Sequence, residues 1–416
     1  MAQTPPTTVR LPPLFITNSA HQVCYQRAIP NTTSPTIQSR MPSREATHAG
    51  SWYSDHEPTL SSQLEKWLAQ VPDELPGIGR LPIAGARVII APHAGYAYSG
   101  PCAAWAYKAL DLSKAKRIFL LGPSHHHHLS TLALPQLTSY KTPLSPDPLP
   151  LDTDLITHLL STTSTNTHFT TMSPPVDSAE HSLELHLPYI HHLLRTLYPT
   201  RAPAAYPRLV PMMVGSTSPA TEAAFGALLA PYLADDTNAF VVSSDFCHWG
   251  LRFGYTYYLP VPAASSTTTT TTRGTATGAA EARAAIDAVS GGGAFKARSR
   301  MLGGGAGVPL IHESISACDV ACMRAIASGE TELFLDALRR TGNTVCGRHP
   351  IGVVMAGLEA VRRSQGEGER DGDGDGDGDG DGLQKSKFYF VRYERSSDVV
   401  AAGESSVSYV SAFTVL

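Results

Sequence analysis

The chain has 416 residues and a formal net charge of −4, and 16% of its residues are charged. This balance, without a block of basic residues, argues against nucleic-acid binding, and no apolar run approaches the roughly 18 residues that span a bilayer. The six cysteines match no disulfide framework. In a chain of this length they indicate reduced thiols inside the cell, so we expect a cytoplasmic protein, with the nucleus left open as a second compartment.

The first 42 residues contain no Asp or Glu and are rich in Pro, Thr and Ser. Acid-poor leaders are typical of mitochondrial transit peptides, but prolines at positions 5, 6, 12 and 13 break any amphipathic helix. We therefore predict a disordered extension over 1–42 and favour the cytoplasm over the mitochondrion. Met41 stands where the ordered pattern begins, so the start of the protein is left open between Met1 and Met41.

Beyond this extension, the apolar residues alternate between helical and strand spacing. A strand, a helix and a second strand in succession predict a parallel pair with a right-handed crossover, and continued alternation predicts an α/β layered domain. The predicted elements are helices over 57–70, 101–110, 151–160, 184–198 and 222–233, and strands over 87–91, 117–121, 209–214 and 239–243.

Two stretches without periodicity interrupt this pattern. One, at about 260–309, holds six consecutive threonines and two glycine runs, and the other, at about 365–385, holds six Asp-Gly pairs. Loop closure entropy grows slowly with length, so we expect both to be flexible inserts in a single domain over 43–416. The remaining predicted elements are helices over 314–327 and 331–341, an apolar segment over 351–361, and strands over 388–393 and 405–415.

Polar side chains follow three of the predicted strands, at the point where each strand ends. His93 follows the run that starts at Val88, His125 follows strand 117–121, and Asp245 and His248 follow strand 239–243. In open α/β sheets, ligands bind beyond the carboxyl ends of the strands. The sequence therefore predicts that these strand ends converge on one metal site.

The donor types suggest which metal this site would hold. The imidazoles of His93 and His125 suit iron, copper or zinc, and Cys346 is a candidate third ligand. Arg348 and His349 lie next to Cys346 in the sequence, and a cationic neighbourhood lowers the pKa of a thiol. Two histidines and one anionic ligand leave coordination positions open, so we expect one iron or copper ion.

Each of these signals is weak when taken alone. A single histidine at a strand end is often a structural hydrogen-bonding group, and a single cysteine is often a small buried hydrophobe. His125 also begins a run of four histidines, which could be a solvated loop with one functional member.

Three further residues are candidates for proton transfer. Asp245 and His248, three residues apart, could form a general acid/base pair, although Asp245 could also cap a following turn. His186 could face the pocket, with Glu180 orienting His181 or a ligand. The alternative is that residues 180–186 form a cluster that caps a helix start.

His48 offers a similar choice near the N-terminal end of the ordered sequence. It follows Glu45 by three residues and precedes Gly50. It could line the pocket, or it could tie the N-terminal turn to the sheet.

Seven segments, in this order and spacing, resemble the Memo family. They are REATHAGSWY at 44–53, APHAGYAY at 91–98, LGPSHH at 121–126, EHSLELHLPY at 180–189, VVSSDFCHWG at 241–250, CGRHPIG at 346–352 and SSVSY at 405–409. The resemblance covers roughly 43–259 and 310–416, and the N-terminal extension and both inserts are departures from the family pattern.

The resemblance implies a three-layer α/β/α sandwich with a central mixed sheet, similar to class III extradiol ring-cleaving dioxygenases. It implies that His93, His125 and Cys346 bind a non-haem metal, and that His248 and His186 correspond to the acid–base histidines of the dioxygenases. Those enzymes have a glutamate where this chain has Cys346, so the resemblance does not extend to ring cleavage.

Two functions remain in view. The first is a metal-dependent redox protein, an oxidoreductase if it is an enzyme at all, which the family resemblance links to signalling, the cytoskeleton and cell motility. The second is a non-catalytic adaptor whose pocket binds a peptide, such as a phosphotyrosine segment, through His48, Trp52, Trp249 and Arg348. A hydrolytic zinc enzyme is disfavoured, because no glutamate stands at a familiar metalloprotease spacing. The sequence names neither a substrate nor an oligomeric state.

Overall fold

The structure is a computed structural model that describes residues 42–162, 167–259, 278–294, 309–366 and 383–416. The predicted extension over 1–42 therefore lies almost entirely outside the described residues, as do most of the two predicted inserts. Residues 41–416 form one unit. Within the described residues, no helix is both long and apolar enough to cross a bilayer.

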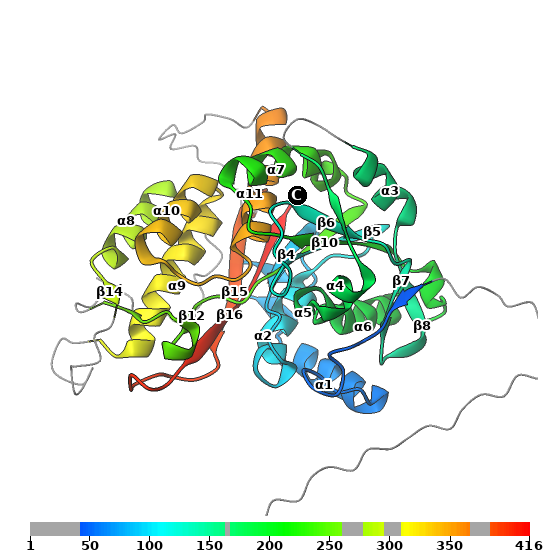
Figure 1. Cartoon of the computed structure of the whole chain (residues 1–416), viewed down its shortest axis with the longest axis horizontal. Helices are drawn as coiled ribbons and strands as arrows, with labels where there is room; N and C mark the ends of the chain where they lie inside the picture. The colour runs from blue at the N-terminus through cyan, green and yellow to red at the C-terminus, as the bar shows by residue number, and fades with distance from the viewer. Residues whose placement is uncertain (1–41, 163–166, 260–277, 295–308, 367–382) are drawn as a thin grey trace, which may run out of the picture. The chain divides into compact units, whose positions relative to one another are not determined.

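A mixed sheet of nine strands organises this unit (Figure 1). Its centre consists of four parallel strands in the order β4, β11, β5 and β10, which span Ala86–Ala91, Asn238–Ser243, Arg117–Pro123 and Arg208–Val214. Almost every residue of these strands is buried, as expected for parallel strands covered on both faces. The four strands confirm the predicted ones, each extended by one or two residues.

Antiparallel strands extend the sheet on both sides. Next to β4 lies β16 (Ser406–Val415), which also pairs with β15 (Phe388–Arg395) and β12 (His248–Trp249). On the other side, β6 (Leu132–Pro135) runs antiparallel to β10 and pairs with β9 (Thr170–Met172). The smaller sheets are formed by β1 (Ser43–Arg44), β7 (Ser139–Thr142) and β8 (Ser145–Pro150), by β2 (Glu74–Leu75) and β3 (Gly79–Arg80), and by β13 (Tyr257–Tyr258) and β14 (Gly293–Ala294).

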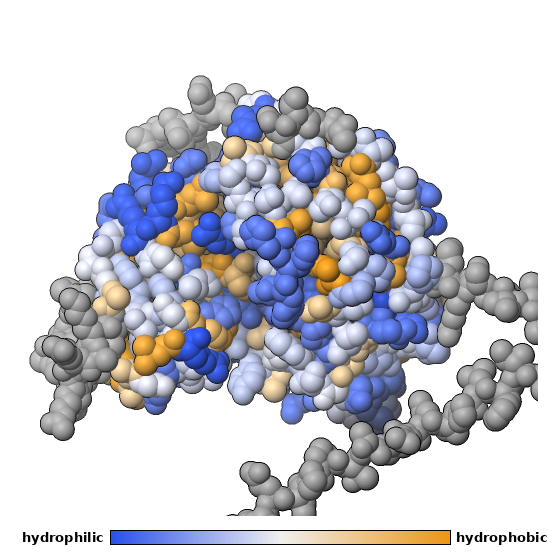
Figure 2. Space-filling model, viewed as in Figure 1, coloured by the Kyte–Doolittle hydropathy of each residue, from blue (hydrophilic) through white to orange (hydrophobic). Residues whose placement is uncertain are grey.

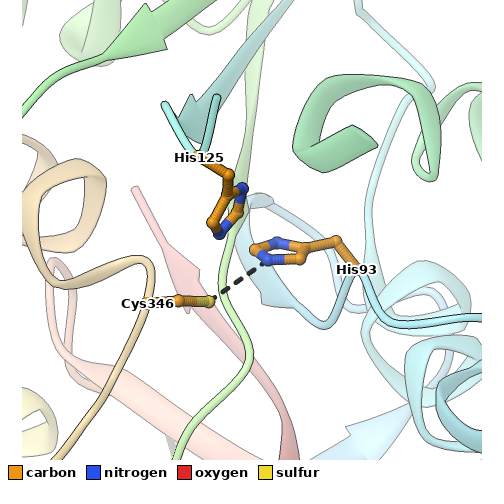
Figure 3. Close-up of side chains that lie close together, drawn as sticks. All are labelled: His93, His125 and Cys346. Atoms are coloured by element: carbon orange, nitrogen blue, oxygen red, sulfur yellow. Dashed lines mark hydrogen bonds between the residues drawn. The ribbon is translucent and has the colours of Figure 1, made fainter. Parts of the chain in front are cut away.

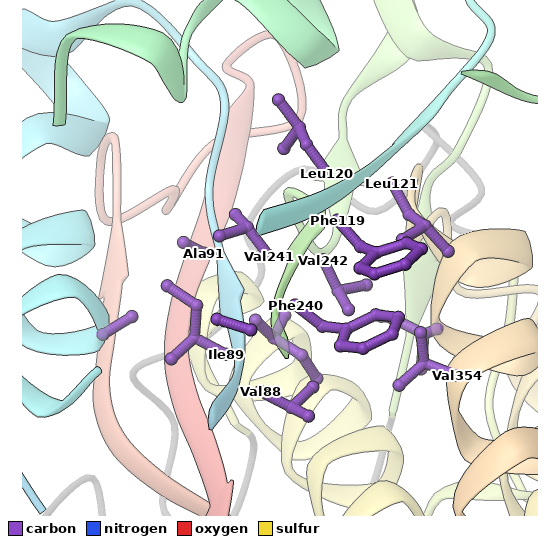
Figure 4. Packing of buried hydrophobic residues seen from close by; sticks show 14 of the residues in the cluster. Val88, Ile89, Ala91, Phe119, Leu120, Leu121, Phe240, Val241, Val242 and Val354 are labelled. Carbon is purple, nitrogen blue, oxygen red and sulfur yellow. The ribbon is translucent and has the colours of Figure 1, made fainter. Parts of the chain in front are cut away.

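Helices cover both faces of the central sheet, as Figures 1 and 4 show. On one side lie α1 (Glu57–Gln70), α2 (Tyr96–Ala109) and α6 (Leu187–Leu197), and on the other α7 (Pro219–Ala234) and α11 (Arg348–Ser364). The rings of Phe119 and Phe240 stack with their centroids 4.5 Å apart, next to Val354 of α11 (Figure 4). The remaining α-helices are α3 (Thr153–Ser161), α4 (Pro174–Ala179), α5 (His181–Glu184), α8 (Ala279–Val289), α9 (Ile311–Ser328) and α10 (Thr331–Thr341).

Three predicted elements differ from the structure. Helix α2 begins at Tyr96, five residues before its predicted start at Pro101. The helix predicted over 184–198 is interrupted, because the ring of Pro188 at the start of α6 would clash with the carbonyl of Glu184 in a continuous helix. The insert predicted over 260–309 contains α8, which packs on α9 and α10, so a structureless loop is wrong for this part.

The close packing of α7 on α11 gives a prediction for Gly226. A Cβ atom at this position would lie 2.6 Å from the backbone nitrogen of Gly357 and 2.8 Å from the Cβ atom of Ala356. We expect Gly226→Ala to lower the free energy of unfolding by about 1–3 kcal/mol, the usual cost of overpacking. Gly403→Ala, whose added Cβ meets no atom within 4 Å, is the control for denaturant unfolding. Equal stability of the two variants would contradict the packing described here.

Candidate metal centre

Three adjacent parallel strands end at the same edge of the sheet. His93, Asp245 and His125 follow β4, β11 and β5, which are neighbours in that order. Cys346, from the turn between α10 and α11, reaches the same place, and the ligand atoms of His93, His125 and Cys346 all lie within 4.8 Å of one another (Figure 3). Figure 2 shows hydrophilic residues gathered in the middle of this face, over the region of the β4 and α5 labels in Figure 1.

The hydrogen bonds of His93 determine which ring nitrogen is free. Its Nδ1 atom lies 2.6 Å from Ser243 Oγ, and that hydroxyl donates its own proton to the carbonyl of Ser182 at 2.7 Å. Ser243 therefore accepts from the Nδ1–H of His93, which leaves a lone pair on Nε2. Nε2 lies 3.2 Å from the Cys346 Sγ atom. Burial, followed by the charges of neighbouring histidines, holds the pKa of His93 well below its usual value, so the ring is neutral.

Glu180 orients His125 in a similar way. Its carboxylate accepts from the backbone N–H of His125 at 2.7 Å and lies 2.9 Å from the ring Nδ1. An ionised carboxylate only accepts, so Nδ1 carries the proton and Nε2 is free. Burial would raise the pKa of Glu180, but the hydrogen bonds that it accepts from His125 and from the backbone N–H of Ser182 lower it to about 2. Glu180 also accepts from the backbone N–H of Ser182 at 3.0 Å, so it caps α5 as well as orienting His125.

The surroundings of Cys346 differ from the predicted ones. Burial, and then the negative charge of Asp245, raise the pKa of the thiol well above its usual value. Arg348 is exposed, and the Nδ1 atom of His349 is bonded to Glu222 at 2.6 Å. The prediction that these neighbours lower the pKa of Cys346 is therefore wrong. The Sγ atom instead accepts from the backbone N–H of Asp245 at 3.2 Å.

Asp245 and His248 lie beside the three candidate ligands. Asp245 is fully buried, accepts from the backbone N–H of His93 at 2.9 Å, and has its pKa raised by burial. No turn follows it, because residues 244–247 lead directly into β12, so the alternative that Asp245 caps a following turn is wrong. His248 Nδ1 donates to the carbonyl of Phe246 at 2.8 Å, which leaves its Nε2 free. Ligand atoms of Asp245, His248 and Cys346 also lie within 4.8 Å of one another.

His186 lies deeper in the protein. It is fully buried, its ring centroid is 6.5 Å from that of His93, and burial lowers its pKa to about 3. Its Nδ1 atom is 2.7 Å from the hydroxyl of Tyr107, and its Nε2 atom has no partner among the described residues. The structure thus brings His186 close to the candidate ligands as a neutral imidazole.

Two further contributors were not predicted as site residues, and the first is His181. Its ring stacks on that of His125, with the centroids 4.4 Å apart, and lies tilted against the ring of Trp52 at 4.5 Å. Burial lowers its pKa to about 3. Its position next to Glu180 in the sequence was the only available signal. The second is Ser243, which ends a strand and gave no signal, because its role depends on the side chain it meets in the fold.

The four residues proposed to line a peptide pocket do not form one surface, although His48 and Trp52 are neighbours with ring centroids 5.9 Å apart. The Nδ1 atom of His48 lies 2.8 Å from the carboxylate of Glu184, and the ring of His48 contacts His181. Trp52, which is 37% exposed, also contacts His181. Trp249, however, is completely buried in an apolar cluster, and its indole donates to the carbonyl of Tyr257 at 2.9 Å. An indole enclosed in this way cannot contact a peptide, so the prediction for Trp249 is wrong.

Comparisons with known proteins agree with the resemblance seen in the sequence. A family model described as Memo-like protein matches residues 44–413. Protein MEMO1 of Rattus norvegicus is 37% identical over 373 residues, which is 90% of this chain and 97% of the relative, and Protein MEMO1 of Homo sapiens is 36% identical over the same shares. A MEMO1 family protein of Schizosaccharomyces pombe is 35% identical over 370 residues, 89% of this chain and 98% of the relative. The chain belongs to the Memo family.

Proposed function

We propose that this Memo protein is a metal-dependent redox protein that holds one iron or copper ion with His93, His125 and Cys346. The observation that carries the proposal is the convergence of three ligand atoms within 4.8 Å, with the Nδ1 atom of each histidine already engaged. Each Nε2 therefore offers its lone pair toward the same point as the Sγ atom, as metal-ligating histidines generally do.

The donor set fits such an ion. Two neutral imidazoles and one thiolate suit copper or iron and leave positions for a substrate or for oxygen. The raised pKa of Cys346 is consistent with this proposal, because a thiolate that is partly removed from water needs a compensating positive charge, which a metal cation supplies. When bound, the metal contributes a change of oxidation state and an open coordination position.

The remaining side chains have proton-handling roles in this proposal. The free Nε2 of His248 accepts or donates a proton near Cys346, and Asp245 holds the His93 backbone while its raised pKa favours retention of a proton. His186, deeper in the protein, is a second neutral imidazole that can accept a proton. We infer an arrangement related to the class III extradiol dioxygenases, with chemistry other than ring cleavage because Cys346 replaces a carboxylate.

A second candidate function, peptide binding in signalling and cell motility, is favoured by one observation. Trp52 is 37% exposed and Arg348 is exposed, so both side chains are accessible to a partner. A pull-down with a phosphotyrosine peptide separates the two functions. Binding that survives His93→Ala and is lost in Arg348→Ala supports the adaptor, and the absence of binding in the wild type removes it.

Elemental analysis of protein purified without chelators tests the metal proposal. We expect about one equivalent of iron or copper per chain, and a reversible change of its oxidation state on mild oxidation and reduction. Purified wild-type protein that holds neither metal, and takes up neither on reconstitution, would contradict the proposal.

Glu180→Gln is predicted to weaken metal binding without removing a ligand. The amide can donate a proton toward Nδ1 of His125 and removes the charge that fixes its orientation, so we expect a loss of affinity of about 10–100-fold. A chelator competition titration measures the change, and Glu65→Gln, an exposed carboxylate of α1, is the control. Unchanged affinity in Glu180→Gln would show that Glu180 does not orient a ligand.

A further inference from the structure

A second cleft opens at the opposite edge of the central sheet from the candidate metal centre. It has a volume of about 570 Å³, within the range of small-molecule sites. Arg117 and Arg208, the first residues of β5 and β10, line it, whereas His125 follows the other end of β5. The two sites therefore lie beyond opposite ends of the same strands.

The cleft concentrates positive charge. Lys116, Arg117, Arg201 and Arg208 line it, against the two carboxylates of Asp152 and Asp154. Arg117 and Arg208 are direct neighbours in the parallel pairing of β5 with β10. Like charges side by side on adjacent strands are destabilising, so this arrangement costs stability unless anions accompany it.

The two carboxylates compensate this charge only in part. Asp152 is buried, accepts from Arg117 Nε at 2.6 Å and also caps α3, so it fixes the position of the guanidinium. This bond leaves the Nη groups of Arg117 without a partner among the described residues. Asp154 lies 3.9 Å from Arg208 with 93% of its side chain exposed, a pair that contributes little.

The other two cations have no carboxylate partner in the described part of the chain. Lys116 is exposed, and the Arg201 guanidinium lies over the ring of Tyr198, with its central carbon 4.2 Å from the ring centroid. Stacking of this kind holds the plane of a guanidinium and leaves its N–H groups at the edge free to bind an anion.

We propose that this cleft binds a phosphorylated small molecule. Three guanidinium groups and one ammonium offer the bidentate and point-charge contacts by which proteins hold phosphate oxygens. The volume of about 570 Å³ admits more than a single phosphate group, so a diphosphate, free or as part of a nucleotide, fits the cleft.

Titration calorimetry with inorganic pyrophosphate on the full chain tests this proposal. We expect binding of one pyrophosphate, weakened by at least about 10-fold in the double variant Lys116→Gln/Arg201→Gln, because each lost contact is a charge-assisted hydrogen bond. The control is Arg339→Gln/Arg363→Gln, which removes the same charge from exposed positions on α10 and α11 and should bind like the wild type. A parallel titration with ADP distinguishes a nucleotide, which binds more tightly than pyrophosphate, from a free diphosphate.

Three results would overturn the proposal. The first is the absence of binding at millimolar pyrophosphate. The second is an equal loss of affinity in both double variants, which would reflect net charge alone. The third is binding that survives Lys116→Gln/Arg201→Gln but is lost in His93→Ala, which would place the anion at the metal centre. Unfolding temperatures of all variants establish that each one is folded. Because the metal content of the double variant is expected to equal that of the wild type, the outcome is independent of the metal proposal.

Discussion

His93→Ala is expected to abolish stoichiometric metal binding, with a loss of affinity greater than the roughly 100-fold that follows removal of an outer partner. His93 supplies Nε2 within hydrogen-bond distance of Cys346 Sγ, and its ring is held in place by Ser243. Metal content after reconstitution measures the effect. His93 is buried, so its truncation also disturbs packing. His125→Ala is therefore a second test at a more accessible position, and we expect the same loss of metal.

The histidine run provides a matched control for this experiment. His128→Ala removes an exposed imidazole three residues from His125, and we expect full retention of the metal. Metal bound equally by His93→Ala, His125→Ala and His128→Ala would contradict the site. Metal lost from His125→Ala and His128→Ala but retained by His93→Ala would indicate that the histidine run, and not the proposed site, binds the ion.

Arg44→Met is expected to lower the free energy of unfolding by about 3–5 kcal/mol, the usual cost of removing one partner from a buried ion pair. Arg44 is fully buried and pairs with Asp177 through Nε at 3.1 Å and with Glu184 through Nη1. It also donates to three backbone carbonyls in the segment 177–180. Without the guanidinium, two buried carboxylates would be left close together, next to the segment that positions Glu180.

Denaturant unfolding measures this loss, and Arg339→Met, an exposed arginine of α10, is the control, with little expected change. A loss below about 1 kcal/mol for Arg44→Met would place the pair in the class of weak surface contacts and contradict the description.

The pH dependence of stability provides a second measurement on the same network. Burial would raise the pKa of Glu184, but hydrogen bonding from His48 and the charge of Arg44 lower it from 4.5 to about 2. A carboxyl whose pKa is lower in the folded state stabilises the fold above its unfolded value. This contribution is present above pH 4.5 and is lost as the pH falls toward 2. In Arg44→Met the contribution should be smaller and its loss should be complete at a higher pH, because the pKa of Glu184 in the folded state moves upward toward its unfolded value.

The four central parallel strands were predictable from the sequence, because strands that are buried on both faces consist of short, continuous apolar runs. Strands β7 and β8 were not predicted, because both are short and partly exposed and β8 contains several prolines. Pro188 stands at the start of α6, as proline usually does in a helix. Pro101 instead lies inside α2, where the surrounding packing overrides the preference of proline for the first turn.

The site was predictable to the extent that strand order determines it. His93, His125 and Asp245 follow adjacent strands, so the rule that ligands bind at strand ends brought them together. Cys346 comes about 100 residues after Asp245 in a turn. Its choice as the third ligand depended on its cationic neighbours in the sequence, whose predicted effect on the pKa is wrong, and on the family resemblance. The stacking of His181 and the hydrogen bond that His93 donates to Ser243 depend on side-chain orientation, which a sequence pattern does not contain.

The most direct test of the metal centre is the absorption spectrum of metal-free protein on anaerobic addition of cupric ion, and in parallel of ferrous ion. We predict a thiolate-to-copper charge-transfer band that saturates at about one equivalent and is absent in Cys346→Ser. A wild-type protein that binds copper without this band, or a Cys346→Ser protein that retains it, would contradict ligation by Cys346 and with it the proposed site.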